Sequence, residues 1–213
     1  MSTTQTAAVS RKSATHKIAV TAMLSAVATV LMFLEFPIPF LIPSFVELDF
    51  SELPALLAAF SLGPVSGVIV CLVKNVIKGL LFSGTGGVGE MCNFLLGICF
   101  VIPAGLIYRY KKTRSGALIG ALAGAIIMAV CSVPVNYFIS YPVYTKFLPI
   151  DVIVSMYQEI VQRFGDFFHA SWQVNGLLSC LIIFNAPFTL LKGLLDMALC
   201  FLIYKPLSPL LHK

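Results

Sequence analysis

Five long stretches with almost no charge constrain this chain more than any other feature of its sequence. They cover residues 18–34, 53–73, 91–108, 115–139 and 177–204. A transmembrane helix needs about 20 consecutive, mostly apolar residues. Charged residues make up only 11% of the 213 residues, against about 25% in a typical soluble domain. Because so few charges cannot cover a globule with a solvated surface, the sequence predicts an integral membrane protein.

Proline and glycine divide these stretches into six predicted helices. Three prolines in residues 35–50 end the first helix, because proline cannot continue a helix interior. Gly63-Pro64 is a turn signal that splits the second stretch in two. Residues 1–15 are expected to form a flexible cytoplasmic tail, and residues 16–213 a single membrane domain. The sequence therefore predicts an all-α integral membrane protein with six transmembrane helices, at residues 18–34, 51–62, 65–82, 91–108, 115–139 and 177–204.

Basic residues are distributed unevenly between the two ends of these helices. With six spans, both termini and the turns at residues 63–64 and 109–114 share one side. That side holds nine of the 14 lysines and arginines and none of the nine acidic residues. Basic residues collect on the cytoplasmic side of membrane proteins, so we expect cytoplasmic termini in a multi-pass protein of the bacterial cell membrane. This clustering also explains the net charge of +5 without a nucleic-acid partner.

The opposite side carries three outer loops, at about residues 35–50, 83–90 and 140–176. Loops longer than about 12–15 residues are usually functional or disordered. In the third loop, residues 158–168 mix aromatic and aliphatic side chains with charges, which is typical of a short amphipathic helix at a surface. Long loops outside and short turns inside predict a ligand site that opens to the exterior.

Polar residues form a stripe along the last predicted helix. Asn185, Thr189, Lys192 and Asp196 are spaced by four, three and four positions, so they share one helix face. A lysine deep in a span costs about 2.5–3.5 kcal/mol on insertion scales, and it therefore faces the protein interior with a partner. We predict that Lys192 contacts a ligand. An ion pair with Asp196, four positions later, is the structural alternative.

Other polar residues lie next to the outer loops. Lys74 and Lys78 share a face of the third helix, and Lys78 is close enough to the outer end to reach the interface. Glu90 and Asn93 lie beside the glycine-rich loop, and Asn136 is followed by three tyrosines within eight residues. Amides, a cation and aromatic rings near the outer leaflet suit a planar, polar, ring-shaped ligand.

The sequence contains no catalytic or metal-binding motif. Residues 84–89 match G-x-G-x-x-G letter for letter, but a dinucleotide fingerprint joins a strand to a helix in a βαβ unit, whereas these residues join two membrane spans. No G-x-x-x-x-G-K-[ST] segment is present to bind ATP, and the three histidines lie far apart. We therefore expect no enzyme activity, no catalytic cofactor and no metal, and a membrane-bound enzyme is the least favoured interpretation.

Four segments resemble those of a known family. They are Glu35-Phe-Pro-Ile-Pro, Leu48-Asp-Phe-Ser-Glu-Leu-Pro-Ala-Leu, Gly89-Glu-Met-Cys-Asn-Phe-Leu-Leu-Gly and Pro187-Phe-Thr-Leu-Leu-Lys-Gly. Together they make nearly the whole chain similar to the riboflavin-specific S components of energy-coupling-factor (ECF) vitamin transporters. The resemblance implies a six-helix subunit that captures its vitamin from outside. Such a subunit docks with a transmembrane coupling protein and two cytoplasmic ATPases, and it turns over in the membrane to release the vitamin.

The resemblance also implies roles for single residues. Lys192 is then a flavin ligand, and Thr189 stands where the family usually has asparagine, so that a hydroxyl replaces an amide at this contact. The other candidate ligand-binding residues are Asn136, Glu35, Asn93 and Asp49.

A pair of small residues on the first helix corresponds to the family's docking surface for the coupling protein. Ala22 and Ala26 are four positions apart, and small residues at this spacing allow another helix to pack closely in lipid. Packing inside the bundle is the alternative explanation.

Two further interpretations stay open. The same fold could bind FMN or another vitamin such as thiamine, since Lys74, Lys78 and Lys192 can meet a phosphate. A solitary secondary transporter would belong to another class of protein, and it would use Lys192 and Asp196 as an ion relay. That interpretation predicts uptake without an ATPase partner.

Overall fold

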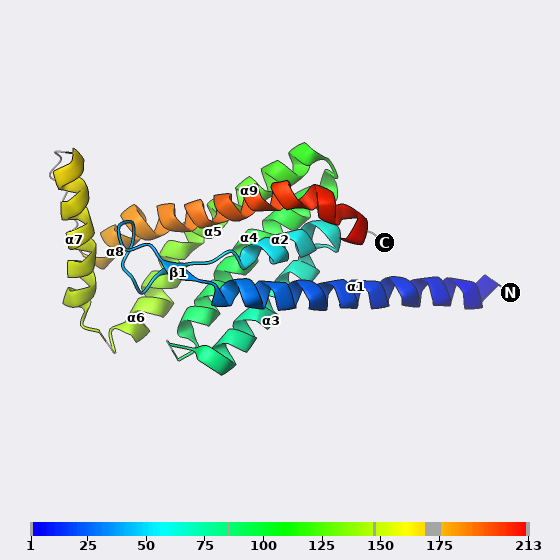
Figure 1. The fold of residues 1–213 in the computed structure, drawn as a ribbon, viewed down its shortest axis with the longest axis horizontal. Coiled ribbons are helices and arrows are strands. Elements are labelled where there is room, and N and C mark those ends of the chain that lie inside the picture. Colours follow the sequence, from blue (N-terminus) through cyan, green and yellow to red (C-terminus); the bar gives the residue numbers. More distant parts are fainter. Residues whose placement is uncertain (1, 85, 147, 169–175, 212–213) are drawn as a thin grey trace.

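The computed structural model describes residues 2–84, 86–146, 148–168 and 176–211, and the regular secondary structure of this part of the chain is helical apart from one pair of very short strands (Figure 1). The strands β1 (Phe36–Pro37) and β2 (Glu47–Leu48) pair antiparallel. The helices are α1 (Ser2–Phe33), α2 (Glu52–Ser61), α3 (Pro64–Phe82), α4 (Val88–Tyr110), α5 (Arg114–Val135), α6 (Tyr141–Tyr144), α7 (Ile150–Phe168), α8 (Leu177–Cys180) and α9 (Ala186–Leu211), together with two π-helical turns, η1 (Asn136–Ser140) and η2 (Leu181–Asn185). The predicted all-helical class is confirmed.

Within the described residues, five helical stretches are long and apolar enough to cross a membrane. They are Ala14–Phe33, Pro64–Phe82, Val88–Tyr110, Arg114–Tyr144 and Leu177–Tyr204. The sixth predicted span corresponds to α2, which is apolar but has only ten residues. At 1.5 Å per residue it extends about 15 Å, or half of a hydrocarbon core about 30 Å thick. Residues 34–51, which include the β1–β2 pair, connect α1 to α2.

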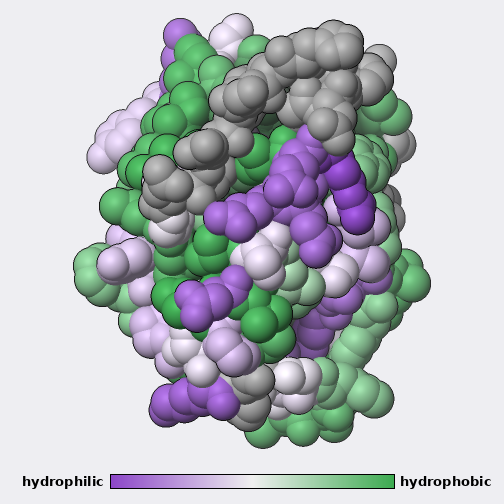
Figure 2. Space-filling model, turned by 90° about the vertical axis from the view of Figure 1, so that its left-hand side faces the viewer, coloured by the Kyte–Doolittle hydropathy of each residue, from purple (hydrophilic) through white to green (hydrophobic). Residues whose placement is uncertain are grey.

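The long helices run roughly along one axis, and the two chain ends lie at the same end of the molecule, together with the α4–α5 turn (Figure 1). At the opposite end, α7 lies across the other helices, nearly at right angles to them. Hydrophilic side chains cross this end, while hydrophobic side chains cover the flanks (Figure 2). This distribution fits an end that faces water and flanks that face lipid.

Several helices are longer than the sequence predicts. The backbone of α1 is helical back to Ser2, where a flexible tail is expected. The fifth helix continues beyond residue 139 through η1 and α6 to Tyr144. Pro142 follows the π-helical turn η1 closely, and such a turn already departs from the regular hydrogen-bond pattern of an α-helix. The fourth helix begins at Val88, directly after Gly87, whose φ of 88° ends the glycine loop.

The third outer loop contains the predicted amphipathic helix. It is α7, whose 19 residues begin eight positions earlier than expected. Ile153, Tyr157, Ile160 and Val161 are buried, whereas the charged and amide side chains between residues 151 and 163 are exposed. Residues 169–175 of this loop lie outside the described residues.

Small residues bring α4 and α5 into close contact. A methyl group added to Gly124 would lie 2.4 Å from the carbonyl oxygen of Phe100, and one added to Gly120 would lie 2.7 Å from that of Ala104. Neither backbone carbonyl can move aside as a flexible side chain could. Helices in lipid associate mainly through such close backbone packing, so these glycines fix the distance between α4 and α5.

We expect Gly124→Ala to lower the thermal midpoint of the purified protein, because overpacking a close contact costs about 1–3 kcal/mol. Gly79→Ala on α3 is the matched control, since its added methyl group would meet only Glu90, at 3.8 Å, and alanine is the better helix former. The measurement is thermal unfolding in detergent. Equal midpoints for the two variants would show that the α4–α5 contact relaxes easily.

Candidate ligand-binding site

A cavity of about 360 Å³ opens among the last residues of α1 and α3 and the first residues of α4 and α9. Its wall combines residues of α1, α3, α4, α5, η1, α6, η2 and α9 with the segment between α1 and α2. Pockets for drug-sized ligands typically measure about 300–1,000 Å³, so the cavity has the size of a small-molecule site. All six predicted ligand-binding residues line it: Glu35, Asp49, Asn93, Asn136, Thr189 and Lys192.

The apolar part of the wall can hold a flat ring. Met32, Leu96, Met128 and Phe188 line the cavity from four different helices. Aromatic rings add to them at the outer side, where Phe45 lies 6.3 Å from the ring of Tyr141 and 6.0 Å from the ring of Tyr144. Apolar walls with a few fixed polar groups are typical of sites that bury a ligand and set its orientation.

Lys192 forms an ion pair that was not predicted from the sequence. Its Nζ lies 2.8 Å from Oδ2 of Asp49, and both side chains are mostly buried. The predicted structural alternative, a pair between Lys192 and Asp196, is therefore wrong. The carboxylate oxygens of Asp196 are buried without a hydrogen-bond partner among the described residues. The ion pair ties α9 to the segment before α2 and places a charge on the cavity wall.

Asp49 is held in its ionised form by several groups. Burial alone would raise the pKa of this carboxyl, but the positive charges of Lys192 and Lys74 and the hydrogen bonds from Lys192 and Ser51 outweigh burial and hold the pKa well below its usual value. The backbone N–H of Ser51 donates to Oδ1 of Asp49 at 2.7 Å, and the Ser51 hydroxyl donates to the same oxygen. Asp49 is thus a fixed negative group beside the cavity.

A second buried ion pair continues this network away from the cavity. Lys74 on α3 lies 2.6 Å from Oε1 of Glu52, and the two side chains are 0% and 1% exposed. Lys74 also donates to the Ser51 hydroxyl at 2.5 Å. The Asp49-Phe-Ser-Glu52 segment therefore supplies partners for two lysines of the membrane bundle, although sequence spacing alone did not connect these residues.

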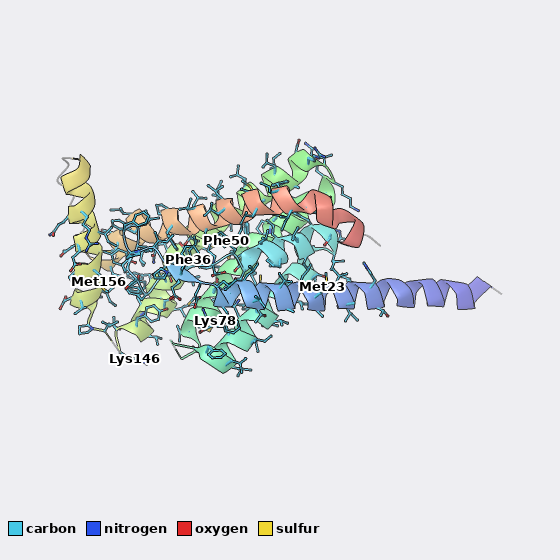
Figure 3. All side chains as sticks on the ribbon, viewed as in Figure 1. Met23, Phe36, Phe50, Lys78, Lys146 and Met156 are labelled. Carbon is cyan, nitrogen blue, oxygen red and sulfur yellow. The ribbon has the colours of Figure 1, made fainter. Side chains whose placement is uncertain are left out.

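A third ion pair lies at the mouth of the cavity. Lys78 of α3 pairs with Glu35, which directly precedes β1. Phe36 and Phe50 are labelled near the end of α1 in Figure 3. Phe36 and Phe50 pack with their ring centroids 6.3 Å apart. This pair links the segment before β1 to α3, so the mouth is closed partly by a charge contact.

Glu47 on β2 also faces the mouth and titrates near neutral pH. Partial burial, a hydrogen bond with Glu35 and the negative charges of Glu35 and Asp49 together raise its pKa from 4.5 to about 7, against the opposing charge of Lys78. A folded-state pKa above the ordinary value means that the folded protein binds more protons than the unfolded chain. The stability contributed by protonated Glu47 is therefore lost as the pH rises from about 4.5 to about 7.

We expect the thermal midpoint to fall less steeply between pH 5 and pH 7 in Glu47→Gln than in the wild type, because glutamine stays neutral. The control is Glu159→Gln on α7, where the glutamate is exposed and lies 4.0 Å from Arg163, and it should follow the wild type. Thermal unfolding across this pH range measures the difference. Parallel curves for wild type and Glu47→Gln would contradict the assignment of Glu47.

Two asparagines face the cavity from irregular turns. Asn136 is the first residue of η1 and Asn185 is the last residue of η2, and both line the cavity. π-helical turns inside α-helices are frequent at functional sites. Asn185 belongs to the polar stripe of the last helix, and its position here shows that three of the four stripe residues reach the cavity.

A multi-helix membrane bundle with a polar, ring-sized cavity near one end defines a membrane protein that binds a small molecule, and the comparisons agree. The family model "ECF transporter, substrate-specific component" matches residues 16–204. The chain therefore belongs to the family of ECF transporter substrate-specific components.

Two similar curated proteins are both described as riboflavin transporters. The riboflavin transporter RibU of Staphylococcus aureus (strain TCH60) is 35% identical over 191 residues, which are 90% of this chain and 89% of RibU. The riboflavin transporter FmnP of Bacillus subtilis (strain 168) is 30% identical over 199 residues, which are 92% of this chain and 94% of FmnP. A solved S component of a bacterial ECF transporter superposes with a TM-score of 0.68 at 34% identity, over 92% of this chain and 98% of that one.

Proposed function

We propose that this chain is the riboflavin-binding S component of an ECF-type vitamin transporter in the bacterial cell membrane. The observation that carries the proposal is the cavity, where all six residues predicted to bind a flavin converge. Their side chains offer a cation, carboxylates, amides and a hydroxyl around an apolar and aromatic wall, which fits a ring system with polar edges. The similarity to riboflavin transporters supports the choice of ligand.

Within this proposal the ring system is buried against the apolar wall, and polar residues fix its edges. Lys192 lies on α9, Asn136 begins the π-helical turn η1, and Thr189 lies about one turn before Lys192. Glu35, Asn93 and Asp49 are the remaining proposed contacts. Riboflavin is transported cargo, and no catalytic cofactor is proposed.

Riboflavin fits the cavity charges better than FMN does. The ionisable residues of the lining comprise the carboxylates of Glu35, Glu47, Asp49 and Glu90 and two lysines. Both lysines, Lys78 and Lys192, are already ion-paired with carboxylates of the same lining. A phosphate dianion would therefore meet more negative than positive groups. Competition between riboflavin and FMN for the purified protein tests this preference.

We also propose six membrane crossings with cytoplasmic termini. α2 would make the second crossing, with residues 34–51 as the outer loop that leads into it, and the end with both termini would face the cytoplasm, as the distribution of basic residues indicates. The cavity then opens to the exterior. Release inside would require a transmembrane coupling protein and two cytoplasmic ATPases, which are the proposed partners.

The first test is the absorption spectrum of the protein purified in detergent, followed by titration with riboflavin. We expect flavin bands that are released on denaturation, or quenching of riboflavin fluorescence by the emptied protein. A colourless protein that does not quench riboflavin would overturn the proposal. Uptake by vesicles that contain this chain without any ATPase would instead favour the ion-driven transporter.

A further inference from the structure

Asn185 lies on the cavity wall but was not among the six predicted ligand contacts. It is 3% exposed and lines the cavity together with Thr189 and Lys192, which follow it on the same face of the last helix. Its position at the end of the π-helical turn η2 places a third amide on the cavity wall, beside those of Asn93 and Asn136. An amide can either donate or accept, so its orientation decides which ligand group it can bind.

Two tyrosines fix this orientation. The hydroxyl of Tyr157 donates to Oδ1 of Asn185 at 3.1 Å, and the hydroxyls of Tyr157 and Tyr141 are 2.6 Å apart. A hydroxyl has a single proton, so a Tyr157 that donates to Asn185 must accept its bond from Tyr141. Burial raises the pKa of Tyr157 above its usual value, and the hydroxyl therefore keeps the proton that it donates.

Tyr157 is held in place by packing on the outer end of the bundle. It lies on α7, it is 0% exposed, and its ring is 5.5 Å from the ring of Phe184, the neighbour of Asn185. Ile153 and Val161, one turn before and one turn after Tyr157, are buried in the same cluster. Through Tyr157, the helix α7, which lies across the end of the molecule in Figure 1, contacts Asn185 on the cavity wall.

We infer that Asn185 is a further ligand contact whose NH₂ group faces the cavity because Tyr157 of α7 occupies its carbonyl oxygen. Tyr157 is a positioning residue, since it does not line the cavity itself. The ligand group at Asn185 is then a hydrogen-bond acceptor, such as a ring carbonyl or a ring nitrogen. This inference rests on the proposed function, because riboflavin supplies such acceptors.

A double-mutant cycle with riboflavin as the ligand tests the inference. Tyr157→Phe keeps the ring that packs on Phe184 and removes only the hydroxyl, so we expect riboflavin affinity to fall roughly three- to ten-fold. Asn185→Ala should weaken binding by at least as much. The double variant should bind like Asn185→Ala alone, because Tyr157 acts through Asn185. Tyr110→Phe, at a tyrosine that is 90% exposed, is the matched control.

The outcomes separate this inference from the proposed function. If Tyr157→Phe binds riboflavin as tightly as the wild type, or if the two single losses multiply in the double variant, Tyr157 does not position Asn185 and the inference fails. If α7 only supported the fold, the two losses of riboflavin affinity would be independent and would multiply in the double variant. If the wild type itself does not bind riboflavin, the proposed function fails first.

Discussion

Lys192→Ala is expected to weaken riboflavin binding by about ten- to a hundred-fold and to lower the thermal stability as well. The variant loses a charge-assisted hydrogen bond to the ligand, worth about 1.5–3 kcal/mol. It also leaves Asp49, which is 4% exposed, without its partner at 2.8 Å. Removing one member of a buried ion pair typically destabilises by about 3–5 kcal/mol. Riboflavin titration and thermal unfolding of the same preparation measure the two effects.

Two further variants separate the ligand contact from the structural pair. Lys192→Met combined with Asp49→Asn removes both charges, so stability should largely return while tight binding does not. Lys74→Met is the matched control, because Lys74 is also a buried lysine in an ion pair but does not line the cavity. It should lower stability more than affinity. Wild-type affinity in the doubly neutral variant would show that Lys192 is structural only.

The sequence was a good guide to the residues that line the cavity, but a poor guide to the ion pairs that they form. Lys192, Thr189 and Asn136 were accessible to sequence reasoning because polar groups in membrane helices must face the protein interior. The partner of Lys192 was not, because Asp49 is 143 positions away and helix periodicity relates only positions a few residues apart. The same limit hid the pair between Lys74 and Glu52.

The fold was predictable where proline and glycine mark a break and less so elsewhere. Gly63-Pro64 separates α2 from α3 as expected. The predicted second span, residues 51–62, is only about 18 Å long at 1.5 Å per residue, so the shortness of α2 was already visible in the sequence. The extent of α7 and the two π-helical turns depend on tertiary contacts, among them the bond between Tyr157 and Asn185, which no local pattern records.

The proposed docking surface on α1 leads to the second large effect. Ala22→Trp or Ala26→Trp is expected to abolish riboflavin uptake by cells while leaving riboflavin binding by the purified chain intact. Both alanines are exposed on the side of α1 that faces away from the bundle core, whereas Leu24 and Ala28 are buried. A close helix contact through small residues cannot accommodate an indole. Binding is spared because neither alanine lines the cavity.

Met23→Trp is the control that makes this result specific. Met23 follows Ala22 directly on α1 (Figure 3) and is 42% exposed. Because successive helical residues are turned by about 100°, tryptophan at this position adds the same bulk beside the proposed contact and not within it. We expect uptake to persist in Met23→Trp and to fail in both alanine variants. Uptake that survives in Ala22→Trp and Ala26→Trp would place the docking surface on another helix, whereas failure in all three variants would indicate that α1 tolerates no added bulk on its exposed side.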